Sequence, residues 1–362
     1  MKKHNVVLIP GDGIGVETSA AMTKVVAASG AQIEWVEAEA GAACIEKHGT
    51  PLPEATIQAI HEHRTAIKGP VTTPVGTGFR SVNVALRQAL NLYVNLRPVM
   101  SIPGAGGRYD DVDLVIVREN TEDLYAGIEF EVGKKETEEL IDFINEREKG
   151  KISRDSGISI KPISVNATRD IVDYAFDYAI KNHRSQVTCV HKANIMKHSD
   201  GLFLREARHV AEQYKDEVDF NDKIVDAFCM NMVMDPTQFD VIVFPNLYGD
   251  IASDLAAGLV GGLGLAPGAN IGKRYAVFEA VHGSAPDIAG KDMANPTAQI
   301  LSAAMMLDHL GEHEPAKRIR EAVKAVYAKG EHLTADIRRA NGEIAAPATC
   351  TEFTNALIEE LA

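Results

Sequence analysis

The feature that most constrains the fold of this sequence is a repeated change from short apolar runs to amphipathic stretches. The run D-V-I-V-F at 240–244 has the composition of a strand that is buried on both faces. A Pro-Asn-Leu-Tyr-Gly turn follows, and we expect a helix to begin at Asp250. Alternation of strands and helices predicts an α/β fold. Comparable strands, each with a helical segment nearby, are predicted at 5–9, 33–38, 66–70 and 185–192.

Asp250 and Asp254 are four residues apart, so they project from one face of the predicted helix. We expect Ile251, Leu255 and Leu259 on the opposite side to face the core. Two carboxylates this close repel each other unless a cation lies between them, which makes the pair a candidate metal site. Alternatively, Asp250 is a helix N-cap and Asp254 a solvated surface residue. This stretch alone does not separate the two interpretations.

The composition of the chain limits the kinds of molecule that the protein can bind. The formal net charge of −14 over 362 residues argues against nucleic acid and anionic membranes. No apolar run approaches the roughly 18 residues of a membrane span, and the N-terminal apolar stretch is too short for a signal peptide. We therefore expect a cytoplasmic protein. The widely spaced cysteines indicate buried, reduced thiols and neither a disulfide framework nor a metal site: Cys44, Cys189, Cys229 and Cys350.

An arginine cluster offers anion binding in spite of the acidic chain. Ser81 and Asn83 lie at a predicted helix start, where free N–H groups and the helix dipole favour an anion. Arg87 shares a helix face with Asn83, and Arg97 and Arg118 follow strand-like runs. A single arginine is most simply a surface residue with a salt-bridge partner. Three in such positions predict a carboxylate-binding site.

Glycine-rich stretches carry further predictions. Gly11, Gly13 and Gly15 follow a strand, with Glu37 about twenty residues later, but their G-x-G-x-G spacing differs from the dinucleotide fingerprint. We interpret them as a tight turn near a ligand cleft. The stretch 258–272 predicts a hinge or domain crossing, and 276–290 a strand that leads into a loop at a ligand rim. The charged stretch 129–157 predicts an inserted arm, followed by a strand at 157–165.

Several long motifs together resemble the isocitrate and isopropylmalate family of β-decarboxylating dehydrogenases. The resemblance covers essentially the whole chain, and S-V-N-V-A-L-R (81–87) is similar to the isocitrate branch. The motifs are P-G-D-G-I-G (10–15), R-E-N-T-E-D-L-Y-A-G-I-E (118–129), V-H-K-A-N-I-M (190–196), N-L-Y-G-D-I-A-S-D (246–254) and H-G-S-A-P-D-I-A-G-K-D-M-A-N-P (282–296).

The resemblance implies a two-lobed α/β fold that is not a Rossmann fold, with an inserted dimer clasp. The large, cofactor-binding lobe would comprise 1–91 and 261–362, and the small lobe, for substrate and metal, 92–122 and 165–260. The clasp would span 123–164 and knit two subunits into a homodimer.

The resemblance also implies NAD-dependent oxidative decarboxylation of isocitrate in the tricarboxylic acid cycle. Tyr125 and Lys192 would be catalytic, and Lys192 and Asp226 would come from the neighbouring subunit to form shared active sites. The substrate would be held by Ser81, Asn83, Arg87, Arg97 and Arg118, and Mg²⁺ or Mn²⁺ by Asp226, Asp250 and Asp254. The cofactor would contact Thr73, Asn194, His282, Gly283, Ser284, Ala285, Asp287, Ile288 and Asn295.

Other activities of the same family remain open. Asp287 and Ile288 stand where NADP-dependent members carry Lys-Tyr, which favours NAD. A sibling enzyme would act on homoisocitrate, isopropylmalate or tartrate. A non-catalytic regulatory subunit usually lacks part of the metal or acid–base set, whereas this chain keeps Tyr125, Lys192 and all three aspartates.

Overall fold

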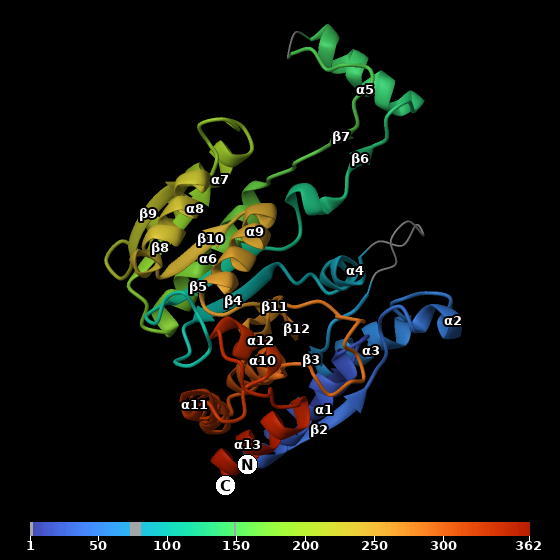
Figure 1. The fold of residues 1–362 in the computed structure, drawn as a ribbon. Helices are drawn as coiled ribbons and strands as arrows, with labels where there is room; N and C mark the ends of the chain where they lie inside the picture. The colour runs from blue at the N-terminus through green and yellow to red at the C-terminus, as the bar shows by residue number, and fades with distance from the viewer. Residues whose placement is uncertain (1–2, 73–80, 148–149) are drawn as a thin grey trace.

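A mixed sheet of ten strands runs through the molecule in the computed structural model, which describes residues 3–72, 81–147 and 150–362 (Figure 1). Its order is β2-β1-β3-β12-β11-β4-β5-β10-β8-β9. The α/β prediction is therefore confirmed. The strands are β1 (His4–Ile9), β2 (Ile33–Glu37), β3 (Thr65–Lys68), β4 (Val94–Met100), β5 (Asp113–Glu119), β8 (Gln186–His191), β9 (Asp219–Ile224), β10 (Val241–Phe244), β11 (Pro267–Ile271) and β12 (Ala276–Ala280).

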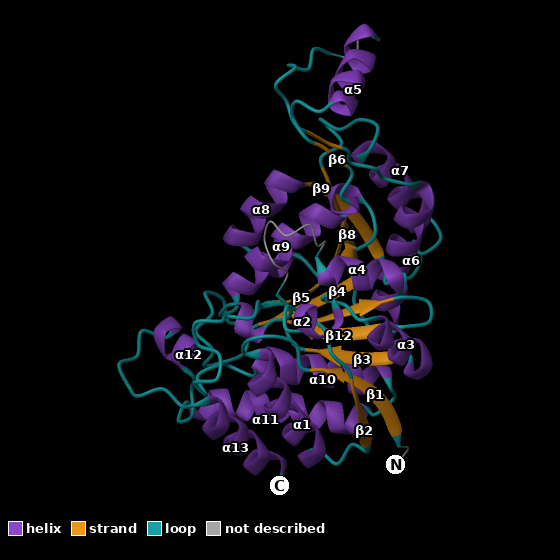
Figure 2. Cartoon of the chain, turned by 90° about the vertical axis from the view of Figure 1, so that its right-hand side faces the viewer, coloured by secondary structure: helices purple, strands orange, loops and turns teal. Residues whose placement is uncertain are grey.

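Helices cover both faces of this sheet (Figure 2). None of those in the described ranges is long and apolar enough to cross a membrane. They are α1 (Gly15–Ala28), α2 (Cys44–His48), α3 (Glu54–His63), α4 (Val82–Ala89), α5 (Lys135–Glu146), α6 (Val165–Lys181), α7 (Asp200–Ala211), α8 (Val225–Met234), α9 (Asn246–Leu259), α10 (Thr297–His309), α11 (His313–Lys329), α12 (Ala335–Ala340) and α13 (Cys350–Leu361), with short 3₁₀ turns η1 (Asp123–Ala126), η2 (Pro236–Gln238) and η3 (Leu263–Leu265).

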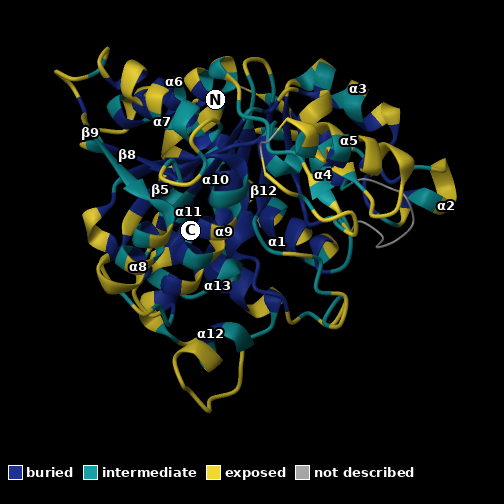
Figure 3. Cartoon of the chain, turned by 90° about the horizontal axis from the view of Figure 1, so that it is seen from above, coloured by how far each residue is buried: buried dark blue, intermediate teal, exposed yellow. Residues whose placement is uncertain are grey.

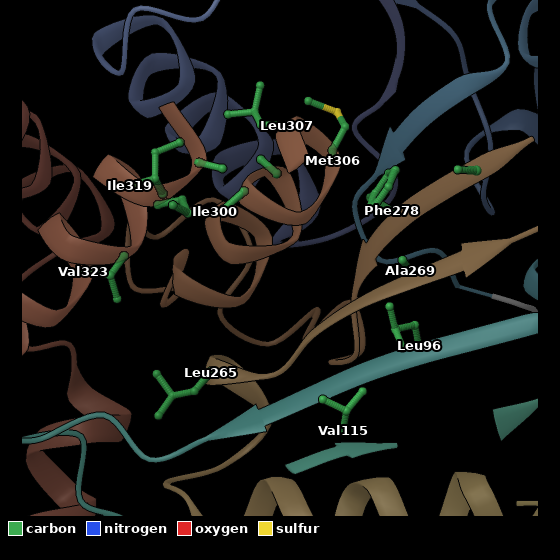
Figure 4. Close-up of a cluster of buried hydrophobic side chains, with 14 of the residues drawn as sticks. Leu96, Val115, Leu265, Ala269, Phe278, Ile300, Met306, Leu307, Ile319 and Val323 are labelled. Carbon is green, nitrogen blue, oxygen red and sulfur yellow. The ribbon is translucent and has the colours of Figure 1, made fainter. Parts of the chain in front are cut away.

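The main hydrophobic core lies between the sheet and the helices α1, α6, α7, α10, α11 and α13. Figure 4 shows the part of this core where α10 and α11 pack on β4, β11 and β12. In α11 the apolar positions recur at helical spacing, so Ile319, Val323 and Val326 are all buried. Gly330 ends this helix in the left-handed conformation that glycine adopts without strain. Buried residues are concentrated along the sheet and its covering helices, whereas exposed residues mark the periphery (Figure 3).

The sheet is parallel except around β4 and β11. β11 is antiparallel to β12 and to β4, and β4 is antiparallel to β5. The glycine-rich stretch 258–272 is predicted from sequence to be a hinge or domain crossing, but its second half contains the central strand β11. Gly268 suits this strand because a Cβ there would lie only 3.2 Å from the carbonyl oxygen of Glu279 on β12.

An arm projects from the rest of the molecule (Figure 1). Its stem pairs β6 (Glu129–Phe130) with β7 (Ile158–Ser159), and it carries helix α5. The predicted strand at 157–165 is thus reduced to two residues. Pro162 explains part of this difference because it has no N–H to donate to a strand partner.

Two expectations for the helix with the paired aspartates are also wrong. Helix α9 begins at Asn246 rather than at Asp250, so Asp250 is not its N-cap. Ile251 was expected in the core, yet it is 56% exposed, whereas Leu259 is buried. A helix that packs on the sheet with one side leaves residues on its other side at the surface.

Candidate active site

Helix α9 and strand β5 bring an arginine and an aspartate together. Arg118 is only 1% exposed, and its Nε donates to the backbone oxygen of Asn246 at 2.9 Å. Its Nη1 lies 2.5 Å from Oδ1 of Asp250. Gly249 permits this approach, because a Cβ there would lie 2.5 Å from Cγ of Arg118.

Asp250 is also bonded to the predicted catalytic tyrosine. The hydroxyl of Tyr125 on η1 donates to Oδ2 of Asp250 at 2.5 Å, and the Arg118 guanidinium lies 4.7 Å from the centre of the Tyr125 ring. Burial raises the pKa of Tyr125, and the hydrogen bond to Asp250 raises it further. Tyr125 is therefore protonated at neutral pH, as a proton donor must be.

Arg97 joins the two aspartates of α9. Its guanidinium nitrogens lie 3.7 Å from Asp250 and 3.6 Å from Asp254. Burial lowers the pKa of Arg97, and the nearby charge of Arg87 lowers it further. Burial, followed by the charges of Arg97 and Arg87, also lowers the pKa of Arg118 to about 10. The arginines thus repel one another in a dry site, and an anionic ligand would relieve this repulsion.

A buried polar network that includes residues of β11 and β12 holds the arginine cluster in place. Arg87 on α4 donates to Oδ1 of Asn270 at 3.0 Å, and Asn95 donates to the same oxygen at 2.8 Å. Glu279 forms ion pairs with Lys68 and with Arg87. Sequence reasoning missed Lys68, Asn270 and Glu279, because strands β3, β11 and β12 become neighbours only in the folded sheet.

Replacement of Glu279 by Gln should destabilise the protein. Burial raises the pKa of Glu279, but Lys68 and Arg87 outweigh it and hold the value at about 2, below the ordinary 4.5. A depressed pKa stabilises the fold above pH 4.5, and this contribution is lost as pH falls towards 2. Urea unfolding at pH 7 should show a loss of about 3–5 kcal/mol in the variant, since Lys68 keeps a buried charge without its partner. The difference in free energy of unfolding between the variant and the wild type should be smaller at pH 3 than at pH 7. An equal difference at both pH values would contradict this account.

A cavity of about 160 Å³ lies beside the arginines, and Asn83, Arg87, Arg97 and His282 line it. Oδ1 of Asn83 and Nε2 of His282 are buried and have no hydrogen-bond partner in the described part of the chain. Buried polar atoms without partners are costly unless a ligand or water satisfies them. The cavity therefore fits a polar ligand that spans the arginine cluster and the loop after β12.

That loop packs on the glycine turn at 10–15. The N–H of Ile14 donates to the backbone oxygen of Ser284 at 2.9 Å, and a Cβ on Gly13 would lie 2.0 Å from that oxygen. Gly13 thus serves close backbone packing, in agreement with its interpretation as a tight turn near a ligand cleft.

The predicted cofactor residues occupy several environments. Gly283 and Asp287 are exposed, and Ser284, Ala285 and Ile288 are partly exposed, in the loop after β12. Asn295 is buried and already bonded to Tyr327 and Asp336, so its amide supports the loop. Asn194 is exposed in the loop after β8. Thr73 lies outside the described residues.

Lys192 and Asp226 form a separate pair. The ammonium group of Lys192, just after β8, pairs with Asp226 in the first turn of α8. Within the described ranges, no three His, Cys, Asp or Glu side chains are grouped so that they could hold a metal ion. One chain therefore does not bring Asp226 to Asp250 and Asp254.

A buried ion-pair network links the arm to the turn that carries Tyr125 and to the loop that carries Lys192. Nζ of Lys161 lies 2.8 Å from Asp123 and 3.4 Å from Asp200, both fully buried. Asp123 belongs to the same turn as Tyr125, and Asp200 accepts from the backbone N–H of Lys192 at 2.7 Å. The stem of the arm thus holds the Tyr125 turn close to the loop that carries Lys192.

Comparisons with known proteins give the relatives of this chain. The sequence model described as isocitrate/isopropylmalate dehydrogenase matches residues 5–357. A human protein, described as the mitochondrial alpha chain of NAD-dependent isocitrate dehydrogenase, is 47% identical over 97% of this chain and 88% of its own length. A Dictyostelium discoideum protein, described as a mitochondrial regulatory subunit of NAD-dependent isocitrate dehydrogenase, is 45% identical over 99% of this chain and 92% of its own length.

The fold agrees with these relatives. The crystal structure of isocitrate dehydrogenase from Methylococcus capsulatus is 50% identical, covers 99% of both chains and superposes with a TM-score of 0.89. The expectation of a cytoplasmic protein is contradicted, because the human and Dictyostelium relatives are described as mitochondrial. The predicted fold type is confirmed, and the chain belongs to the isocitrate/isopropylmalate dehydrogenase family.

Proposed function

We propose that this protein is an NAD-dependent isocitrate dehydrogenase, which oxidises and decarboxylates isocitrate to 2-oxoglutarate and CO₂ in the tricarboxylic acid cycle. The observation that carries the proposal is the meeting of Arg97 and Arg118 with Asp250 and Tyr125, with Arg87 close by. Isocitrate carries three carboxylates, and several buried arginines in one site match that charge. Asp250 and Tyr125 supply the remaining chemistry at the same place.

Each side chain has a distinct proposed role. Ser81 and Asn83, at the start of α4, would bind the γ-carboxylate, and the arginines would bind the other two. The protonated hydroxyl of Tyr125 would donate a proton to the substrate carbon that loses CO₂. Lys192 of the partner subunit would accept the proton of the substrate hydroxyl.

The donor set fits a hard divalent cation. Asp250 and Asp254 lie one helical turn apart and offer only oxygen ligands, which suit Mg²⁺ or Mn²⁺. Asp226 of the partner subunit would complete the set of carboxylates. When bound, the metal stabilises negative charge that develops on the substrate oxygens. The side chains of Arg97 and Arg118 orient the two aspartates for this role.

We propose a homodimer, and its support is that Lys192 and Asp226 are paired apart from Asp250 on one chain. Helix α8 exposes Met230 and Met234, which are 55% and 71% accessible, and Ile251 on α9 is exposed as well. Exposed apolar side chains on adjacent helices suit an interface between subunits. A second copy of the chain would cover them, and the arm at 123–164 would clasp the partner.

We also propose that each chain of the homodimer is divided into two lobes. The large lobe would comprise 1–91 and 261–362, and the small lobe 92–122 and 165–260. This division cuts the sheet between β11 and β4, which pair in antiparallel register. The proposed site would lie at this border, because Arg97 is on β4 and Asn270 on β11. Movement of one lobe against the other would then open and close the substrate pocket.

Initial rates test the cofactor choice. We expect a higher kcat/KM with NAD than with NADP at saturating isocitrate, because Asp287 would accept hydrogen bonds from the adenosine ribose and repel a 2′-phosphate. Asp287→Lys combined with Ile288→Tyr should erode this preference. Lys291→Met, on an exposed residue of the same loop, is the matched control and should leave the ratio of the two kcat/KM values near that of the wild type. A wild-type preference for NADP would refute the assignment of Asp287.

Two alternatives are separated by the same assay. The Dictyostelium relative is described as regulatory, and a protein that binds isocitrate without turnover would favour that role for this chain. Retention of Tyr125, Lys192 and the three aspartates favours catalysis. A panel of isocitrate, homoisocitrate, isopropylmalate and tartrate separates the sibling activities, and we expect isocitrate to give the highest kcat/KM.

A further inference from the structure

A second cavity, of about 750 Å³ and open to solvent on one side, lies between strands β4, β11 and β12 and helices α6, α10 and α11. This volume lies within the range of small-molecule sites, about 300–1,000 Å³. None of the arginines, aspartates or loop residues assigned above to substrate, metal or cofactor lines it. The proposed reaction therefore leaves this cavity without a role.

The two cavities lie on opposite faces of the same strands. Neighbouring residues of a strand point to opposite sides of the sheet. On β4, Arg97 lines the substrate cavity, whereas Leu96 and Pro98 line the second one. On β12, Glu279 lines the first and Phe278 the second. One layer of sheet thus separates the second cavity from the arginine cluster.

The inside of the second cavity is mainly apolar, and its rim is charged. The apolar lining includes Leu96, Leu265, Ile271, Phe278 and Leu301. The charged lining comprises four cationic side chains against three carboxylates, an excess of one positive charge in a chain with a net charge of −14. These residues are Lys181, Arg184, Arg320 and Lys324, with Asp113, Asp177 and Asp308.

Two of the four cations are available to a ligand. Arg184 pairs with Asp113 at 2.5 Å, and Arg320 pairs with Asp308. Lys181 and Lys324 have no ion-pair partner among the described residues. A polyanion would meet too few free cations and three carboxylates, whereas a neutral apolar molecule would leave both lysines unused. The lining is therefore complementary to one negative charge on an apolar body.

We propose that this cavity binds a single straight-chain fatty carboxylate. Its hydrocarbon chain would lie against Leu265, Phe278 and Leu301, and its carboxylate would be held at the rim by Lys181 and Lys324. Binding of the chain buries apolar surface, and the lysines select the anion over the corresponding alcohol.

Calorimetric titration of the full-length protein with decanoate and with 1-decanol, both below their aggregation limits, tests the proposal. We expect one saturable decanoate site per chain. The double variant Lys181→Glu/Lys324→Glu should weaken decanoate binding by about tenfold or more, since it replaces attraction by repulsion. Binding of decanol should change little in that variant. Leu301→Trp fills the cavity and should abolish binding of both molecules.

The controls locate the site. Lys215→Glu alters an exposed lysine outside the cavity lining and should leave decanoate binding unchanged. Saturating isocitrate should not displace decanoate, because the two ligands occupy opposite faces of the sheet. The proposal is overturned if the folded protein shows no saturable binding, if isocitrate competes with decanoate, or if the double lysine variant binds decanoate like the wild type. Circular dichroism melting confirms that each variant is folded. If Leu301→Trp does not fold, the double variant Lys181→Glu/Lys324→Glu still tests the proposal, because it alters only surface residues.

Discussion

Two inactive variants should restore activity when they share a dimer. Tyr125→Phe removes the hydroxyl bonded to Asp250, and Lys192→Met removes the ammonium group paired with Asp226. Each homodimer should lose about 10²–10⁴-fold in kcat, as is typical when an acid or base is removed. In a hybrid dimer, one site collects both lesions and the other collects an intact tyrosine and an intact lysine. Random association of equal amounts should therefore recover about a quarter of wild-type activity.

Initial rates after joint refolding, with differently tagged chains to prove that hybrids form, measure this recovery. A mixture of Lys192→Met with Asp226→Asn is the matched control. Lys192 and Asp226 of each chain would both belong to the partner's site. Every site in this mixture therefore contains one of the two substitutions. Persistent inactivity of the first mixture in proven hybrids would show that Lys192 acts within its own chain.

Ser81→Asp should raise the KM for isocitrate strongly. Ser81 is the N-cap of α4, the helix that carries Asn83 and Arg87, and it is partly buried. A new carboxylate there faces a trianionic substrate, and two unit charges 4 Å apart repel by about 4 kcal/mol at an effective dielectric constant near 20. We therefore expect an increase in KM of at least about tenfold. The fold should persist, since a negative charge is favourable at a helix N-terminus.

Steady-state kinetics with each substrate varied in turn gives the readout. The KM for NAD should change little, because Asp287 lies on a different loop, after β12. Ser81→Asn is the matched control, since it alters size without adding charge and should affect the KM for isocitrate much less. Equal effects of the Asp and Asn variants would mean that steric fit, rather than charge, limits binding at this position.

Local periodicity accounts for the parts of the site that the sequence predicts. Asp250 and Asp254 had to share a face once their segment was helical. The three arginines were recognised because they stand at the ends of, or within, segments with strong strand or helix patterns. The helix boundary was wrong by one turn, because the turn Pro245–Gly249 is helical from Asn246 onwards, and boundaries depend on packing as well as on residue type.

Non-local contacts account for what the sequence did not predict. Asn270 and Glu279 hold Arg87 across 183 and 192 residues of chain, so no window of sequence contains the interaction. The stretch that contains β11 is predicted to be a hinge or domain crossing because its glycines weaken the strand pattern, yet β11 lies in the middle of the sheet between β12 and β4.

The sequence by itself determined the α/β class, the paired aspartates, the arginine cluster and the motifs of the family. These properties depend on residue type and on spacings of a few residues, which local backbone geometry converts directly into shared faces. Only the tertiary structure decided which of these groups meet. It joined Tyr125 and Arg118 to Asp250, paired Lys192 with Asp226 elsewhere, and placed a second cavity behind β4 and β12. The order of strands in the sheet sets these contacts, because it alone brings residues far apart in the chain within reach of one another.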